Sequence, residues 1–186
     1  MKQSLGAKTW VYPMPVFIIG TYNDDGTPNA MNAAWGGIAN DKIISICIDR
    51  SHKTAENLAK RKAFTVGVAD CGNIAACDYV GIVSGNDVPD KVARAGFHSS
   101  KSDKVDAPVF DELKMTLVCR MISYDEASDE LLKGEIVDII ADDSVLTDGK
   151  IDPAKLRPIT YDPVNRTYLG IGAKVGTAFS DGKKLV

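Results

Sequence analysis

Three short segments carry the side chains that could hold a ligand. The first, residues 29–35 (NAMNAAW), sets small residues around two asparagines and ends in a tryptophan. Small side chains let a flat ligand approach the backbone, and an asparagine amide offers a donor and an acceptor to a ring that displays both. The candidate contacts are Asn29, Ala30, Met31, Asn32, Ala33, Ala34 and Trp35. Taken alone, these residues also suit an ordinary strand that ends in a core tryptophan.

The second segment, residues 49–54 (DRSHKT), lies between an expected strand and an expected helix. Basic and hydroxyl side chains at a helix start favour an anion such as phosphate, because free N–H groups and the helix dipole point toward it. The candidate phosphate ligands are Arg50, Ser51, His52, Lys53 and Thr54. A capped helix with solvated charges is the alternative. No GxxxxGK[ST] motif is present, so a nucleoside triphosphate is not indicated.

The third segment, residues 81–91, is rich in small and turn-forming residues and is expected to form a loop that packs near a ligand. Its notable charge is Lys91. A surface lysine on a short helix is the alternative interpretation.

Composition narrows the class of protein. The chain has 186 residues, of which 45% are hydrophobic and 25% charged, so we expect a single domain over residues 1–186. The net charge is -3 and the basic residues are dispersed, which argues against nucleic acid as a partner. The longest apolar stretches, about seven residues, fall far short of a membrane span. The first residues lack the apolar run of a secretory signal, so the expected location is the cytoplasm.

The metal-binding residue types are sparse. The cysteines and histidines are Cys47, Cys71, Cys77, Cys119, His52 and His98. No CxxC pair occurs, and the spacing suits no common zinc site, so no metal is predicted. The cysteines are expected to be reduced and mostly buried.

The hydrophobic pattern favours a mainly β fold. Strands are expected at residues 16–22, 29–35, 42–49, 63–69, 113–124, 135–141, 159–161 and 167–171. Helices are expected at residues 51–60, with Ser or Thr as N-cap, and at 73–83, 88–95 and 152–156. The pair Gly36-Gly37 is expected to break the second strand, and the alternation in 113–124 predicts one buried face. Strands in runs with inserted helices favour an antiparallel barrel over βαβ units.

The order of these segments resembles the flavin-reductase-like FMN-binding family of the flavoredoxin type. The matching residues are 15–21, 26–35, 50–57, 83–85, 90–91, 95–96, 168–170 and 175–179. No single motif is diagnostic, but the ordered set is specific and covers nearly the whole chain.

The resemblance implies a Greek-key FMN-binding split barrel, a β-barrel with α insertions, that forms a homodimer with one FMN per subunit near the interface. Residues 29–35 would then line the isoalloxazine ring and ribityl chain. Ser51, Lys53 and Thr54 would hold the phosphate, with Arg50 or His52 nearby. Lys91 would approach the flavin, and near its pyrimidine side would stabilise the anionic reduced form. From its position and polar composition, and not from the resemblance, the segment 97–109 is expected to form a loop over the flavin that sets substrate access.

The expected function is that of an FMN-dependent oxidoreductase similar to flavin reductases. FMN would accept a hydride at N5 from NAD(P)H, or electrons from a small redox protein, and no catalytic side chain is needed. A non-catalytic FMN-binding or storage module is the alternative. A thiol enzyme that uses Cys47, activated by Arg50, His52 and Lys53, is a remoter possibility.

Overall fold

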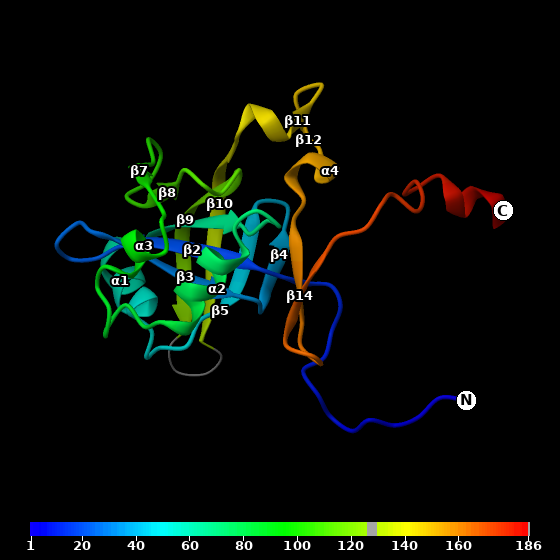
Figure 1. Cartoon of the computed structure of the whole chain (residues 1–186), viewed down its shortest axis with the longest axis horizontal. Helices are drawn as coiled ribbons and strands as arrows, with labels where there is room; N and C mark the ends of the chain where they lie inside the picture. The colour runs from blue at the N-terminus through cyan, green and yellow to red at the C-terminus, as the bar shows by residue number, and fades with distance from the viewer. Residues whose placement is uncertain (126–129, 186) are drawn as a thin grey trace.

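The computed structural model describes residues 1–125 and 130–185 and consists mainly of β-strands (Figure 1). Seven strands form one antiparallel sheet in the order β3-β2-β6-β9-β10-β5-β4. Their bounds are β2 Phe17–Tyr22, β3 Pro28–Ala33, β4 Gly36–Asn40, β5 Ile43–Cys47, β6 Ala63–Val68, β9 Met115–Asp125 and β10 Leu131–Ala141.

The two edge strands of this sheet follow each other directly in the chain, since β3 ends at Ala33 and β4 begins at Gly36. In a flat sheet, six spacings of about 4.8 Å would hold the edges roughly 29 Å apart. The connection of three Cα steps of about 3.8 Å reaches at most about 11 Å. The sheet therefore curls until its edges meet at Ala34 and Trp35, and it forms a split barrel with a seam between β3 and β4.

Strands β2 and β3 are covered on both faces, so all of their residues are buried or partly buried. Ile19 and Met31 belong to a core inside the barrel, to which helix α1 (Lys53–Arg61) contributes Leu58. Ile18 and Ala30 belong to a second core on the outer face. Helices α2 (Ile74–Ile82) and α3 (Lys91–Arg94) and strand β8 (Pro108–Phe110) cover that face.

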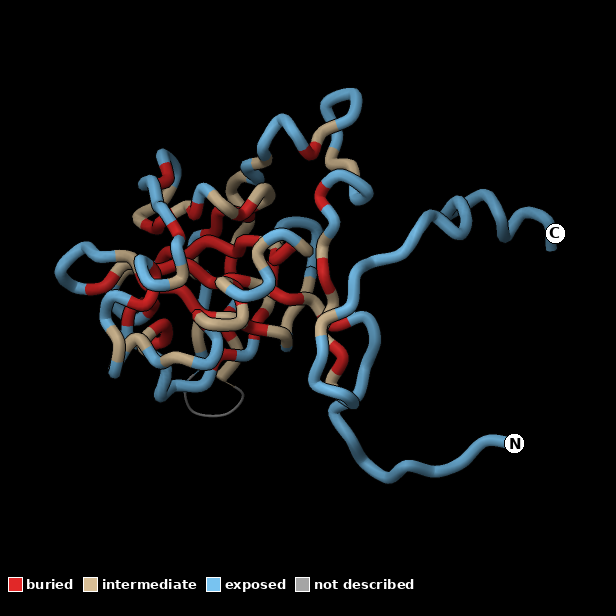
Figure 2. The backbone as a smooth tube through the Cα atoms, viewed as in Figure 1, coloured by how far each residue is buried: buried red, intermediate tan, exposed pale blue. Residues whose placement is uncertain are grey.

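The remaining elements surround the barrel. They are β1 Met14–Pro15, β7 Ser99–Lys101, η1 Asp143–Val145, β11 Leu146–Thr147, β12 Lys150–Ile151, α4 Pro153–Leu156, β13 Ile159–Asp162, β14 Thr167–Gly170 and η2 Asp181–Leu185. Strands β1, β13 and β14 form a separate small sheet. Both terminal segments leave the body on the side of β14 and are exposed along their length (Figures 1 and 2). None of the helices described has the length and apolar character needed to cross a membrane.

The structure confirms a mainly β split barrel and places an element in each expected strand or helix segment, with shifted ends. The strand predicted for residues 29–35 does end before Gly36, but Gly36 and Gly37 then begin a new strand, β4. Glycine at position 36 allows close contact with the neighbouring strand β5. A Cβ atom at Gly36 would lie 2.8 Å from the Ser45 carbonyl oxygen.

Three local expectations also need correction. The N-cap of α1 is His52, which makes no side-chain cap hydrogen bond, so neither Ser51 nor Thr54 caps the helix. Strand β9 has four consecutive buried residues, 116–119, because its first half is covered on both faces. All four cysteines are free, but Cys47 is exposed, at the end of β5. Burial raises the pKa of Cys77 and of Cys119 to about 12.

The two glycines of β4 provide a matched test of the close contact between β4 and β5. We expect Gly36→Ala to lower the free energy of unfolding by about 1–3 kcal/mol, because the added methyl group would overlap the Ser45 carbonyl and Ile46. Gly37→Ala, with no atom within 4 Å of the added Cβ, should have little effect. Urea unfolding measures both, and equal losses would contradict the close contact at Gly36.

Candidate functional site

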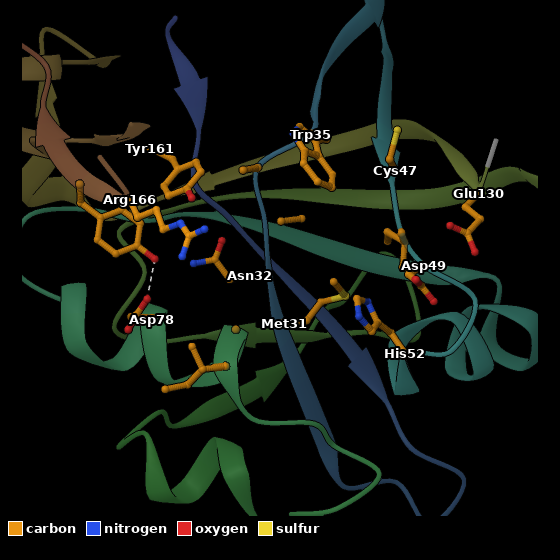
Figure 3. A pocket seen from close by; sticks show the side chains of 16 residues that line it. Met31, Asn32, Trp35, Cys47, Asp49, His52, Asp78, Glu130, Tyr161 and Arg166 are labelled. Atoms are coloured by element: carbon orange, nitrogen blue, oxygen red, sulfur yellow. Dashed lines mark hydrogen bonds between the residues drawn. The ribbon is translucent and has the colours of Figure 1, made fainter. Parts of the chain in front are cut away.

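A cavity of about 610 Å³ lies at the seam of the barrel (Figure 3). Its walls come from the β3–β4 connection, the end of β5, the start of α1, helix α2 and the β13–β14 hairpin. Trp35, Tyr161 and Tyr168 contribute aromatic surface, and Ala33 and Ala34 keep the backbone accessible. Trp35 is 60% exposed, so the cavity is open to solvent at the seam. This shape and lining suit a flat, largely apolar ring.

A second cavity of about 220 Å³ adjoins the first. The residues that line both are Met31, Asn32, His52, Gly81 and Ile82. The smaller cavity is more polar, because Lys53, Thr54, Ser84 and Lys91 also line it. The two cavities together therefore offer a ring-sized apolar region that leads into a small polar region.

The polar cavity is built on a buried amide. Asn29, only 2% exposed, donates from Nδ2 to the Thr54 hydroxyl at 3.0 Å and to the Thr21 hydroxyl at 3.3 Å. Gly85 closes against this amide, since a Cβ atom at Gly85 would lie 2.4 Å from Asn29 Oδ1 and 3.2 Å from Lys53 Cβ. These contacts hold the α2–α3 loop and the start of α1 on opposite sides of one small space.

The start of α1 supplies the conditions for binding an anion. The N-cap His52 makes no side-chain cap bond, and the Ser51 hydroxyl donates to Asp49 instead, at 2.6 Å. The first N–H groups of the helix are therefore left without a side-chain cap, and the helix dipole favours a negative group beside them. Lys53 lies on the same turn and pairs with Glu56 at 2.9 Å.

Lys91 is buried at the back of the polar cavity, with 3% of its surface exposed. Its Nζ donates to the Val80 and Val83 carbonyl oxygens, at 3.0 and 2.8 Å, which lie at the C-terminal end of α2. A cation is favourable at this end of a helix dipole. Burial nevertheless lowers the pKa of Lys91 to about 8.

Helix α2 forms the wall between the cavities and is tied to two further elements. Asn32 of β3 donates from Nδ2 to the Cys77 carbonyl at 3.2 Å. The Tyr168 hydroxyl of β14 donates to Asp78 at 2.7 Å (Figure 3). Burial and this bond to Asp78 raise the pKa of Tyr168, so the phenol is a fixed donor across the neutral range.

Comparison with known families and structures identifies the family of this chain. The model of the family described as "Flavin reductase like domain" matches residues 9–163. The chain belongs to the flavin reductase-like family. Flavoredoxin of Desulfovibrio vulgaris (Miyazaki F) is 36% identical, with a TM-score of 0.93 over 98% of this chain and 100% of that chain.

Two other solved structures extend this likeness. Flavoredoxin from Methanosarcina acetivorans is 28% identical, with a TM-score of 0.91 over 100% of both chains. An FMN-binding domain of a flavin reductases-like enzyme from Shewanella baltica OS155 is 21% identical, with a TM-score of 0.79 over 88% of both chains, and supports the fold alone. No curated protein sequence matches the chain. Membership of the flavin reductase-like family supports a flavin cofactor and a flavin-related redox role.

The structure brings together most of the residues predicted to bind the cofactor. Of the first segment, all except Ala30 line a cavity, and Ala30 is fully buried in the outer core. His52, Lys53 and Thr54 line the polar cavity, whereas Arg50 and Ser51 line neither cavity.

Two further predicted positions differ from expectation. Lys91 lies in the polar cavity and not in the larger one. No residue of the 97–109 segment lines either cavity. That segment includes the β7–β8 hairpin, which packs on β2 and β6.

The cavity also includes residues that the sequence did not single out as ligands: Asp49, Asp78, Gly81, Ile82, Glu130, Tyr161, Arg166 and Tyr168. Tyr168 lies in a stretch that resembles the family, and Gly81 and Ile82 lie in the third segment. Arg166 is part of a turn with no recognisable ligand signal. Within the described part of the chain, no three His, Cys, Asp or Glu side chains group closely enough to hold a metal ion.

The buried position of Lys91 makes a testable difference to stability. Its pKa is lowered from 10.5 to about 8 on folding, so between these pH values the unfolded chain binds a proton that the folded chain lacks. The Lys91 contribution to the free energy of unfolding should therefore rise over this window, by up to about 3 kcal/mol. Urea unfolding of the cofactor-free protein and of Lys91→Met measures this difference. The measurements run from about pH 7 to about pH 11, a range that contains the whole window.

Lys60 provides the control. Its exposed ammonium binds Asp24 and Glu56, which raises its pKa. The difference between the wild type and Lys60→Met should therefore not grow over the same window. Parallel pH curves for the wild type and Lys91→Met would contradict the assignment of a depressed pKa to Lys91.

Proposed function

We propose that the chain is an FMN-dependent electron-transfer protein or reductase, with the FMN phosphate in the small polar cavity and the isoalloxazine ring in the larger one. The observation that carries the proposal is the joining of these two unlike cavities through shared lining residues at the barrel seam. The ribityl chain would pass Met31 and Asn32, which line both.

The residues present fit FMN at both ends. At the phosphate end, the uncapped start of α1, Lys53 and the hydroxyl groups of Thr54 and Ser84 surround a space that Gly85 leaves open. Charged donors and free backbone N–H groups are what a phosphate requires. At the ring end, small residues and aromatic side chains line a space large enough for a flat ring.

When bound, FMN supplies the redox chemistry, accepting a hydride or electrons and passing them on. The chain would orient it: Asn29 holds the Thr54 side chain, and Asn32 and Tyr168 fix the α2 wall. The open rim at Trp35 and Ile82, 60% and 73% exposed, leaves room for NAD(P)H or a small redox protein to approach. Sustained oxidation of NADH or NADPH would separate this role from FMN storage.

The phosphate assignment is testable with two ligands that differ only by that group. We expect Lys53→Gln to weaken FMN binding about tenfold and to leave riboflavin binding unchanged, because a charged hydrogen bond to phosphate contributes about 1.5–3 kcal/mol. Fluorescence titration of the cofactor-free protein gives both Kd values.

Lys60→Gln is the matched control, since Lys60 lies on the same helix, also pairs with Glu56 and lines neither cavity. A Lys53→Gln variant that weakens both ligands equally, or neither, would contradict the placement of the phosphate. Wild-type protein with no affinity for FMN would overturn the proposed function itself.

We also infer that the functional unit is a homodimer. Large apolar side chains of both terminal segments are exposed, including Val11 (59%), Val175 (103%) and Phe179 (97%). Ile38 of β4 and Leu169 of β14 are also exposed. The terminal segments project on the side of β14 (Figures 1 and 2). Exposed apolar surface of this kind usually marks a protein interface.

A second copy is the partner we propose, because each copy would both offer this face and receive the projecting segments of the other. The turn in the C-terminal segment is already ordered internally, since Asp181 accepts from the Thr177 N–H at 2.7 Å and from Lys184 at 3.0 Å. That segment therefore already contains one formed turn, which would pack on the second copy in the proposed dimer.

Light scattering tests the assembly. We expect a mass of about twice the 20.0-kDa chain for the wild type. The double variant Val175→Ser and Phe179→Ser should dissociate at protein concentrations at which the wild type does not, because it removes apolar contacts between copies. A wild-type protein that stays monomeric at high concentration would contradict the homodimer.

A further inference from the structure

The cations near the two cavities are divided between them. Lys53 and Lys91 line only the smaller cavity, and both already have partners within the chain. The larger cavity is lined by one arginine, Arg166. Asp49 and Glu130 lie at its opposite end (Figure 3). Among the residues described, Arg166 is the only lysine or arginine that lines the proposed ring site.

Arg166 is presented to the cavity by an unusually well-fixed turn between β13 and β14. Asp162, 5% exposed, accepts at Oδ1 from the N–H groups of Val164 and Asn165, at 2.9 and 3.3 Å. It also accepts from the Asn165 side chain at 2.7 Å and from the Tyr12 hydroxyl. These bonds, that from Tyr12 foremost, lower the pKa of Asp162 to about 2, so the carboxylate stays charged and the turn stays formed.

The backbone of Arg166 lies in the left-handed region, with φ at 56°. Its N–H donates to the Asp162 carbonyl at 2.9 Å, which closes the turn. Glycine or asparagine fits this conformation without strain, whereas a long side chain is uncommon there. The turn itself therefore gives no reason for an arginine.

The side chain of Arg166 extends toward the cavity beside Asn32, between Tyr161 and Asp78 (Figure 3). Within residues 1–125 and 130–185, its guanidinium group takes part in no hydrogen bond or ion pair of the structure. Asp78 is engaged by Tyr168. A guanidinium is charged at every relevant pH, so the larger cavity contains a fixed positive charge that is free to meet a ligand.

We propose that Arg166 is the residue that stabilises the negative charge which the isoalloxazine ring gains on reduction. This proposal rests on the proposed binding of FMN. A hydride from NAD(P)H delivers two electrons and one proton, so the ring gains one negative charge as the nicotinamide becomes positive. A cation beside the ring binds the reduced form more tightly than the neutral oxidised form. This is the role that the sequence suggested for Lys91, which lies instead in the polar cavity.

The conformation of Arg166 allows a variant that removes the charge without harming the turn. Arg166→Gly places glycine at a left-handed position, so the folded structure should be retained. We expect it to bind oxidised FMN nearly as well as the wild type and reduced FMN at least tenfold more weakly. For a two-electron couple, that ratio lowers the midpoint potential of bound FMN by about 30 mV. Arg166→Lys should restore part of the loss.

Arg157→Gly is the matched control. Arg157 also has a left-handed backbone, with φ at 52°, is exposed and lines neither cavity. Like Arg166→Gly, the Arg157→Gly variant removes one positive charge from a left-handed position. Because Arg157 lies outside both cavities, the potential of bound FMN should not change. Anaerobic dye-coupled titration gives the potential of each variant, and fluorescence titration gives the affinity for oxidised FMN.

The outcomes separate this proposal from the one on which it rests. Wild-type protein that binds no FMN would overturn both. An unchanged potential in Arg166→Gly would overturn only the role of Arg166. A raised KM for NADPH with an unchanged potential would instead assign Arg166 to the donor and would also contradict the proposal. An equal loss of affinity for both redox forms would reduce Arg166 to a general binding contact.

Discussion

Helix α2 is held in one position by hydrogen bonds from three other elements, and both cavities depend on that position. Asn32 of β3 binds the Cys77 carbonyl, Tyr168 of β14 binds Asp78, and Lys91 of α3 binds the last carbonyl groups of the helix. The helix, IAACDYVGI, is apolar along nearly its whole length, so these few polar contacts determine its orientation on the outer core. Because its C-terminal residues line both cavities, they separate the ring region from the phosphate region.

Much of the fold could be predicted from local patterns. The β-branched runs predicted β2, β5 and β6, and the expected strands at 113–124 and 135–141 correspond to β9 and β10, which pair antiparallel. The seam between β3 and β4 could not be predicted from local patterns. Two adjacent glycines are typical of a loop, but here they begin an edge strand, and only the order of all seven strands shows that β3 and β4 lie at opposite edges. The local sequence shows that two adjacent glycines favour a turn, but it does not show how the whole sheet curls.

The candidate site was also only partly predictable from local sequence. Segments 29–35 and 49–54 were predicted because each concentrates its small, amide or basic residues in a short stretch, although Arg50 and Ser51 line neither cavity. The hairpin that supplies Tyr161 and Arg166 lies more than a hundred residues further along the chain, so its position at the seam depends on the tertiary fold. The residue type of Lys91 predicted a role for its charge. Its partners, two carbonyl groups at the end of α2, could not be predicted because they depend on tertiary packing.

We propose that one ligand spans both cavities, with its phosphate at the start of α1 and its ring at the barrel seam. A crystal structure of the protein with FMN tests this most directly. We expect phosphate density between Lys53, Thr54 and the Ser84–Gly85 loop, and ring density between the β3–β4 connection and the β13–β14 hairpin. Phosphate beside Arg166 in the larger cavity, or FMN bound away from the seam, would contradict it.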